Sequence, residues 1–234
     1  MDFLLRVIAA MPSADWLGLA AFFSGWLGYV RFARTRALRR PSVLASTNRI
    51  RQEWMLQTTY REVRVIDGVV VQSLSTSPSF FASTTILIIG GLLAVLGSDK
   101  ANELVRDLPF ASRTTTLIFD LKLILLLGIF VYVFFRFTWS MRQYTFGALL
   151  VAAAPEAERF ISEGLSREAF ADKAGRIVGL AAETFNDGLR AYYFSFAALA
   201  WFISPLVMVA GTVVVVAILY GREFHSDVLR VLRD

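Results

Sequence analysis

Two ionisable residues stand inside an apolar stretch of the sequence. Asp120 and Lys122 lie near the start of residues 117–137, which carry no other charge before Arg136. On a helix, residues two apart point about 200° apart, so each side chain needs its own partner. Ionisable groups within such stretches form ion or proton paths in membrane proteins. The alternative is that Asp120 lies in the outer headgroup zone and the Lys122 ammonium extends to it.

A second group of residues suited to a pore opens the apolar stretch 79–97. Its members are two aromatic and two hydroxyl residues, Phe80, Phe81, Ser83 and Thr84. A ring of such aromatic side chains from several subunits would gate a pore by dewetting. The alternative is that these phenylalanines face lipid, as most do in membrane proteins.

Polar and aromatic residues cluster at two further boundaries of apolar stretches. Arg142 and Gln143 follow residues 117–137, and Asn186 and Arg190 precede the last apolar stretch, 191–220. Antiparallel helices would bring these clusters together. The pattern predicts either interfacial anchoring by arginines and aromatic residues or a buried network of arginine with carboxylate or amide groups.

Other kinds of chemistry find little support in the sequence. Cysteine is absent, which excludes disulfides, thiolate metal sites and cysteine nucleophiles. The single histidine, His225, has Glu223 and Asp227 at strand-like spacing, which is a poor metal set for a helix. No glycine-rich phosphate loop, nucleophile elbow or zinc-protease helix is found. We therefore expect no enzyme activity, no cofactor and no metal.

The composition indicates which elements must position these residues. Of the 234 residues, 56% are hydrophobic, above the roughly 45–50% of soluble domains. The sequence predicts an all-α polytopic membrane protein with about four transmembrane helices, in one membrane domain covering residues 1–234. The predicted spans are 14–33, 79–97, 117–137 and 191–220, with Ser77-Pro78 starting the second and a kink before Pro205 in the fourth. Amphipathic cytoplasmic helices are predicted at 42–76 and 138–190.

The basic residues predict an orientation. Nine Lys and Arg lie between residues 31 and 64 and seven between 136 and 190, whereas the connection after the second span has only Lys100, Arg106 and Arg113. The positive-inside rule places the first two segments in the cytoplasm and, with four spans, both termini in the periplasm. The net charge of +5 then predicts contact with anionic headgroups of the lipid bilayer rather than with nucleic acid.

Four strings of residues together resemble a known family. They are Arg51-Gln52-Glu53-Trp54-Met55, Phe80-Phe81-Ala82-Ser83-Thr84, Phe137-Thr138-Trp139-Ser140-Met141-Arg142-Gln143-Tyr144, and Phe185-Asn186-Asp187-Gly188-Leu189-Arg190-Ala191-Tyr192-Tyr193-Phe194. The chain from about residue 16 to 224 resembles the Domain of Unknown Function family five-nine-nine, multi-span membrane proteins of bacteria and plants. The resemblance implies a bacterial inner-membrane protein and names no substrate.

Two function classes follow. The first is a homo-oligomeric ion channel or small-solute transporter, because small-residue helix faces favour close packing and Asp120 and Lys122 lie in an apolar stretch. The second is a non-conducting scaffold or accessory subunit of a membrane complex, whose polar helices bind partners. We favour the first, and expect several subunits around an axis because four spans enclose little space.

Overall fold

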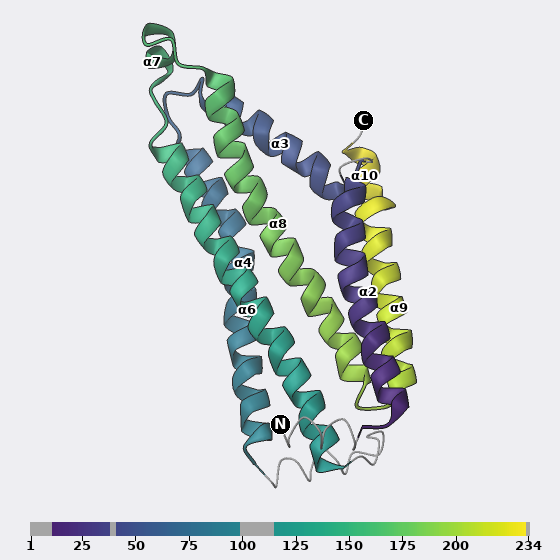
Figure 1. Cartoon of the computed structure of the whole chain (residues 1–234). Coiled ribbons are helices and arrows are strands. Elements are labelled where there is room, and N and C mark those ends of the chain that lie inside the picture. Colours follow the sequence, from purple (N-terminus) through teal and green to yellow (C-terminus); the bar gives the residue numbers. More distant parts are fainter. Residues whose placement is uncertain (1–10, 38–40, 99–114, 233–234) are drawn as a thin grey trace. The chain divides into compact units, whose positions relative to one another are not determined.

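Long helices make up the described part of the chain. The computed structural model describes residues 11–37, 41–98 and 115–232. Within these ranges there is no strand, as predicted for an all-α fold. The helices are α2 (Ser13–Ala37), α3 (Val43–Thr58), α4 (Val65–Leu96), α6 (Thr116–Ala152), α7 (Ala157–Ser162), α8 (Arg167–Ala200), α9 (Pro205–Phe224) and α10 (Asp227–Val231) (Figure 1).

Three helices are long and apolar enough to cross a membrane. They are Val65–Leu96, Thr116–Ala152 and Pro205–Val231, the last comprising α9 and α10. The predicted second and third spans lie within the first two of these helices. The predicted first span, 14–33, lies within α2, which is a single helix but is not among the three. The apolar helices make this a membrane protein, as the composition indicated.

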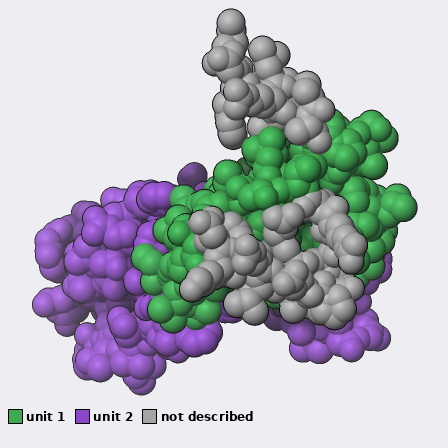
Figure 2. All heavy atoms as spheres, turned by 90° about the horizontal axis from the view of Figure 1, so that it is seen from below, with its two compact units in different colours: residues 1–35, 84–133, 189–221 green, residues 36–83, 134–188, 222–234 purple. Residues whose placement is uncertain are grey.

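The chain forms two compact units, coloured separately in Figure 2. Unit 1 comprises residues 1–35, 84–133 and 189–221, and unit 2 comprises residues 36–83, 134–188 and 222–234. Unit 1 holds most of the apolar stretches, whereas unit 2 holds most of the arginines.

Glycines and aromatic rings pack the helices of unit 1. A Cβ atom on Gly25 of α2 would lie 2.6 Å from Thr212 Cγ2 of α9, and one on Gly18 would lie 3.0 Å from Met208 Cε. The two helices therefore approach closely and run parallel. Between α2 and α8, the rings of Trp26 and Phe194 stack with centroids 5.8 Å apart. Gly18 and Gly25 thus form the part of α2 that packs on α9.

The last apolar stretch is not one span. We predicted a kink near residues 201–204, but α8 ends at Ala200, α9 begins at Pro205, and the chain reverses between them (Figure 1). Gly211 of α9 packs against Ala197 of α8, since a Cβ atom on it would lie 3.4 Å from the Ala197 Cα. The physical reason is that Pro205 cannot donate to a carbonyl of the preceding turn but fits the first position of a new helix.

Unit 2 has an apolar core formed by α3, α4, α6 and α8. Its fully buried members include Met55, Val71, Ala174 and Val178. Helix α6 lies against α8 without room for a side chain on Gly147, where a Cβ atom would be 2.8 Å from Val178 Cγ2. The amphipathic patterns of 42–76 and 138–190 therefore correspond to helices that bury one face in this core.

The prediction that Ser77-Pro78 starts a helix is wrong. Helix α4 begins at Val65 and continues through Pro78, which is buried. Proline in a helix interior removes one hydrogen bond. Here Val71 and the half-buried Leu74 pack into the core of unit 2 on the N-terminal side of the proline. This tertiary packing keeps the helix continuous.

Candidate functional site

Lys122 is the most deeply buried cation in unit 1 among the described residues. Its side chain is 2% exposed, and its Nζ donates a hydrogen bond of 2.9 Å to the backbone carbonyl of Trp201. The ammonium also lies over the Trp201 and Phe202 rings, 5.4 and 5.7 Å from their centroids. Lys122 therefore points into the turn between α8 and α9.

The Trp201 carbonyl is free to accept a hydrogen bond from Lys122 because of the residue that lies four positions after it. In a continuous helix it would accept from the amide four residues later, but that residue is Pro205, which has no N–H. The Trp201 indole Nε1 in turn donates to Asp15 Oδ1 at 2.5 Å. Asp15 is buried in the first turn of α2, where the helix dipole favours a carboxylate. The hydrogen bonds of Lys122, Trp201 and Asp15 together join α6, the α8–α9 turn and α2.

The surroundings of the Asp120 side chain differ from those of Lys122. It is half-buried, and its Oδ1 is a buried atom without a hydrogen-bond partner among the described residues. The two residues therefore have separate surroundings, as their spacing on the helix predicted. No pattern in the sequence linked Asp15 with Trp201, which lie 186 residues apart in the chain.

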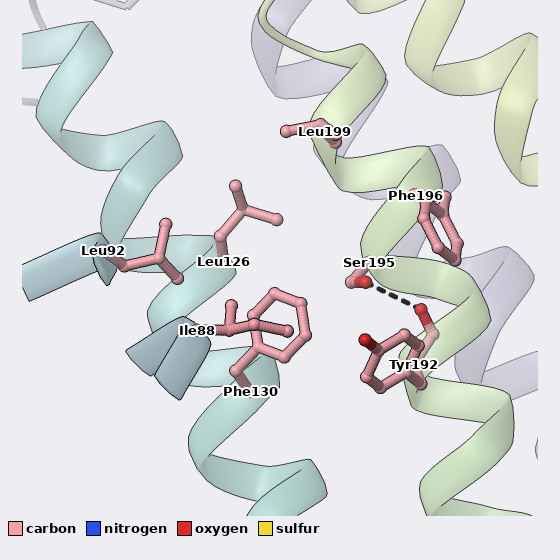
Figure 3. A pocket seen from close by; sticks show the side chains of 8 residues that line it. All are labelled: Ile88, Leu92, Leu126, Phe130, Tyr192, Ser195, Phe196 and Leu199. Atoms are coloured by element: carbon pink, nitrogen blue, oxygen red, sulfur yellow. Dashed lines mark hydrogen bonds between the residues drawn. The ribbon is translucent and has the colours of Figure 1, made fainter. Parts of the chain in front are cut away.

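Unit 1 also contains an apolar pocket of about 220 Å³ between α4, α6 and α8. Figure 3 shows Leu126 and Phe130 of α6 opposite Tyr192 and Ser195 of α8. The Ser195 hydroxyl donates to the Tyr192 carbonyl at 2.7 Å, so it is not free to bind a ligand as donor. A water molecule in a cavity needs two to four polar partners, which this lining does not offer. The pocket suits hydrocarbon and not a polar substrate.

In unit 2, α6 and α8 meet beside the two boundary clusters of the sequence, through an arginine and a carboxylate. Arg136 Nη2 of α6 donates to Asp187 Oδ2 of α8 at 2.6 Å. Gly188 permits this approach, because a Cβ atom there would lie 2.6 Å from the Phe137 ring. Phe81 packs on Phe137 and Phe185, with centroids 5.4 and 5.8 Å away. Phe81 thus contacts its own chain, whereas Phe80 is 65% exposed.

The remaining predicted residues have varied surroundings. Gln143 is buried with its Oε1 lacking a hydrogen-bond partner among the described residues, and Arg190 is buried. Asn186 and Thr84 are half-buried, while Ser83 and Arg142 are exposed. Thr84, Asp120, Lys122 and Arg190 belong to unit 1 and the other six to unit 2. The ten residues therefore do not form one site within either unit.

A polar network that the sequence did not reveal joins α3 to α8 in unit 2. Asn48 Nδ2 donates to Glu183 Oε1 at 3.0 Å, and Arg51 donates to Asn48 Oδ1 at 2.8 Å. Burial lowers the pKa of the Arg51 guanidinium, while Tyr144 and Glu183 act in the opposite sense. Gly175 and Gly179 let α3 lie on α8, since a Cβ atom on Gly175 would be 2.9 Å from the Gln52 Cα. The network therefore fixes α3 against α8.

The turn between α3 and α4 is held by a buried carboxylate and three arginines. Asp67 Oδ1 accepts from Trp54 Nε1 at 2.7 Å, from Thr58 Oγ1 and from Arg61. Arg64 donates to the carbonyls of Ala154 and Pro155 at 2.7 and 2.5 Å, and Arg167 donates to the carbonyl of Thr59. We name Arg64 and Arg167 the arginine clamp, because they tie this turn to the connection between α6 and α8.

No group of three or more metal-ligating side chains occurs within residues 11–37, 41–98 and 115–232. Glu223, one of the two acids near His225, instead accepts a hydrogen bond from the Leu44 amide at 3.2 Å. Its carboxylate thereby satisfies an amide in the first turn of α3.

Comparison with known proteins places the chain in a family. The family model described as "Protein of unknown function, DUF599" matches residues 17–228. The chain belongs to this family. The match extends from within α2 to the second residue of α10 of the DUF599 chain, in agreement with the extent of the resemblance. No curated protein and no solved structure matches this DUF599 chain.

Proposed function

We propose that the chain is the subunit of a homo-oligomeric ion channel or small-solute transporter in the bacterial inner membrane, with α4 facing the oligomer axis. The observation that carries this proposal is the surface of α4. Only 11% of its most apolar stretch is buried, compared with 44% in α6. A membrane helix this poorly covered by its own chain needs lipid or another subunit beside it.

One side of α4 has a composition suited to a pore. Its exposed residues at helical spacing are Gln72, Thr76, Ser83, Gly90 and Ala94. An amide and hydroxyl groups are costly against hydrocarbon but favourable beside water or another polar chain. The only charged residue of α4, Asp67, is buried, so identical copies can meet around an axis without repulsion.

The length of α4 also favours protein contact. Its 32 residues extend about 48 Å, whereas a bilayer core is about 30 Å thick. Even the roughly 40° limit of observed helix tilts leaves about 9 Å of the helix outside hydrocarbon. Val65, Ile66 and Val69 at its N-terminal end are all exposed. Another subunit would cover this apolar surface.

Gly90→Leu tests the assembly. A Cβ atom on Gly90 meets nothing within 4 Å in its own chain, so the variant should fold but clash between subunits. We expect light scattering in detergent to show an oligomer for the wild type and a monomer for Gly90→Leu, and ion flux from proteoliposomes to fall at least tenfold. Gly28→Leu on α2 is the matched control, since Gly28 also has open space. A monomeric wild type would refute the assembly.

A scaffold or accessory subunit is the second candidate. It is favoured by the hydrogen bonds from Lys122 to the Trp201 carbonyl and from the Trp201 indole to Asp15, which give these polar groups a structural role within unit 1. An oligomer that is lost in Gly90→Leu but shows no flux for ions or small solutes would support this function instead.

We further propose five passes through the membrane instead of four. Helices α2 and α9 run parallel, and residues 189–200 of α8 return between α6 and α9 within unit 1. Five passes place the termini on opposite sides. Residues 222–234 belong to the same unit as both basic segments, which the positive-inside rule assigns to the cytoplasm. The C-terminus is then cytoplasmic and the N-terminus periplasmic.

Cysteine labelling separates the two topologies, because the natural chain has no cysteine. We expect Ser226→Cys in intact cells to resist a membrane-impermeant maleimide and to react after permeabilisation, like Glu53→Cys in the first basic segment. The four-span prediction has Ser226→Cys reacting in intact cells. That outcome, with Glu53→Cys protected, would disprove five passes.

A further inference from the structure

An exposed stripe on α6 combines aromatic and aliphatic side chains with one arginine. Phe135, Trp139, Phe146 and Leu149 are 64%, 50%, 37% and 60% exposed, and the exposed Arg142 lies among them. Successive positions are three or four residues apart, which places all five on one side of the helix. The five lie in unit 2 and on one of the helices long enough to cross a membrane.

The Arg142 guanidinium has no ion-pair or hydrogen-bond partner among the described residues. Its one close contact of note is with the Phe146 ring, whose centroid lies 5.9 Å from Cζ. The Trp139 ring packs edge-on against the same Phe146 ring, with the two centroids 6.4 Å apart. Arg136, on the same helix, is by contrast neutralised by Asp187. Among the described residues, an acid thus neutralises the charge of Arg136, whereas none neutralises the charge of Arg142.

We propose that the Trp139–Arg142–Phe146 stripe binds the headgroup of an anionic membrane phospholipid, with the Trp139 ring against the upper acyl chains. The charge of Arg142 indicates which ligand the stripe binds. A positive, uncompensated guanidinium requires an anion, and its planar donors match the two oxygens of a phosphodiester. Tryptophan beside arginine is typical of the membrane–water boundary, where an amphipathic ring has one apolar and one wet end.

A second copy of the chain fits this stripe less well. Parallel copies meeting at α6 would place Arg142 against its own counterpart, with no acid on the stripe to separate the two charges. This assignment does not depend on a channel function. It requires only that the boundary of the bilayer crosses α6 near Trp139, about 35 Å from the start of the helix at Thr116.

Lipid binding by variants in detergent tests the assignment. Purified full-length protein is titrated with dioleoylphosphatidylglycerol or dioleoylphosphatidylcholine, and bound lipid is counted by native mass spectrometry. We expect the anionic lipid to bind more tightly than the zwitterionic one. Arg142→Gln should lower the affinity for the anionic lipid about fivefold, which is the contribution of one basic residue at a membrane surface. It should leave the affinity for the zwitterionic lipid unchanged.

Two controls make the result specific. Arg142→Lys keeps the charge and should retain most of the preference. Arg49→Gln removes an exposed arginine that is already paired with Glu53 at 3.5 Å, and it should bind both lipids as the wild type does. Equal binding of the two lipids by the wild type, or equal losses in Arg142→Gln and Arg49→Gln, would overturn the assignment.

Discussion

Lys122→Met should lower the free energy of unfolding by about 2–4 kcal/mol, because it removes a buried charged donor and leaves its partners in place. The Trp201 carbonyl would lose the hydrogen bond from Nζ, and Pro205 offers no amide in its place. Asp15 would lose the nearest compensating cation in the turn. Equilibrium unfolding in mixed detergent and dodecyl sulfate micelles measures the change.

Lys173→Met is the matched control for this substitution. Lys173 is exposed on α8, where the same change should alter the free energy of unfolding by no more than about 0.5 kcal/mol. If both variants unfold alike, Lys122 does not hold the turn between α8 and α9. A stable Lys122→Met variant that has lost flux would instead assign Lys122 to the conducting path.

The Arg136–Asp187 ion pair should show the second large effect. Either Arg136→Gln or Asp187→Asn alone is expected to cost about 3 kcal/mol, because each leaves the other charge buried without its partner. The double variant should cost less than the sum, with a coupling energy of about 1–3 kcal/mol in a double-mutant cycle. The same unfolding measurement gives all three values.

An exposed pair on α8 provides the comparison. Arg176 and Asp172 lie 3.7 Å apart with side chains 71% and 57% exposed. Their coupling energy should stay below about 1 kcal/mol, as for other solvated ion pairs. Equal coupling energies in the two cycles would contradict a stabilising role for burial at Arg136 and Asp187.

Local patterns in the sequence predicted much of the helical structure. The amphipathic spacing of 166–190 gave the first part of α8, and the apolar stretch 117–137 gave the centre of α6. The expectation that antiparallel helices bring the two boundary clusters together agrees with the hydrogen bond between Arg136 of α6 and Asp187 of α8. The family was also recognised correctly from four strings of residues.

Contacts between residues far apart in the sequence determine the features of the fold that local patterns did not predict. Pro78 has the sequence signature of a helix start, yet Val71 packs into a core that forms only with α6 and α8. The break at Pro205 was placed correctly, but a kink and a reversal share the same local signal. What distinguishes them is the contact of Gly211 with Ala197. The surroundings of Lys122 could not be predicted from local patterns. Asp15 and Trp201 lie far from it in the sequence, and neither belongs to a motif.

The arginine clamp bears on how the protein is made. Arg167 follows Thr59, whose carbonyl it binds, by 108 residues. At about 5–20 residues per second, the ribosome needs roughly 5–20 s to add that length of chain. Helices α4 and α6 are therefore synthesised, and available to the insertion machinery, before the α3–α4 turn can be tied down. Unit 2 completes its structure late in translation, and a ribosome stalled before Arg167 would release a chain whose α3–α4 turn is unclamped.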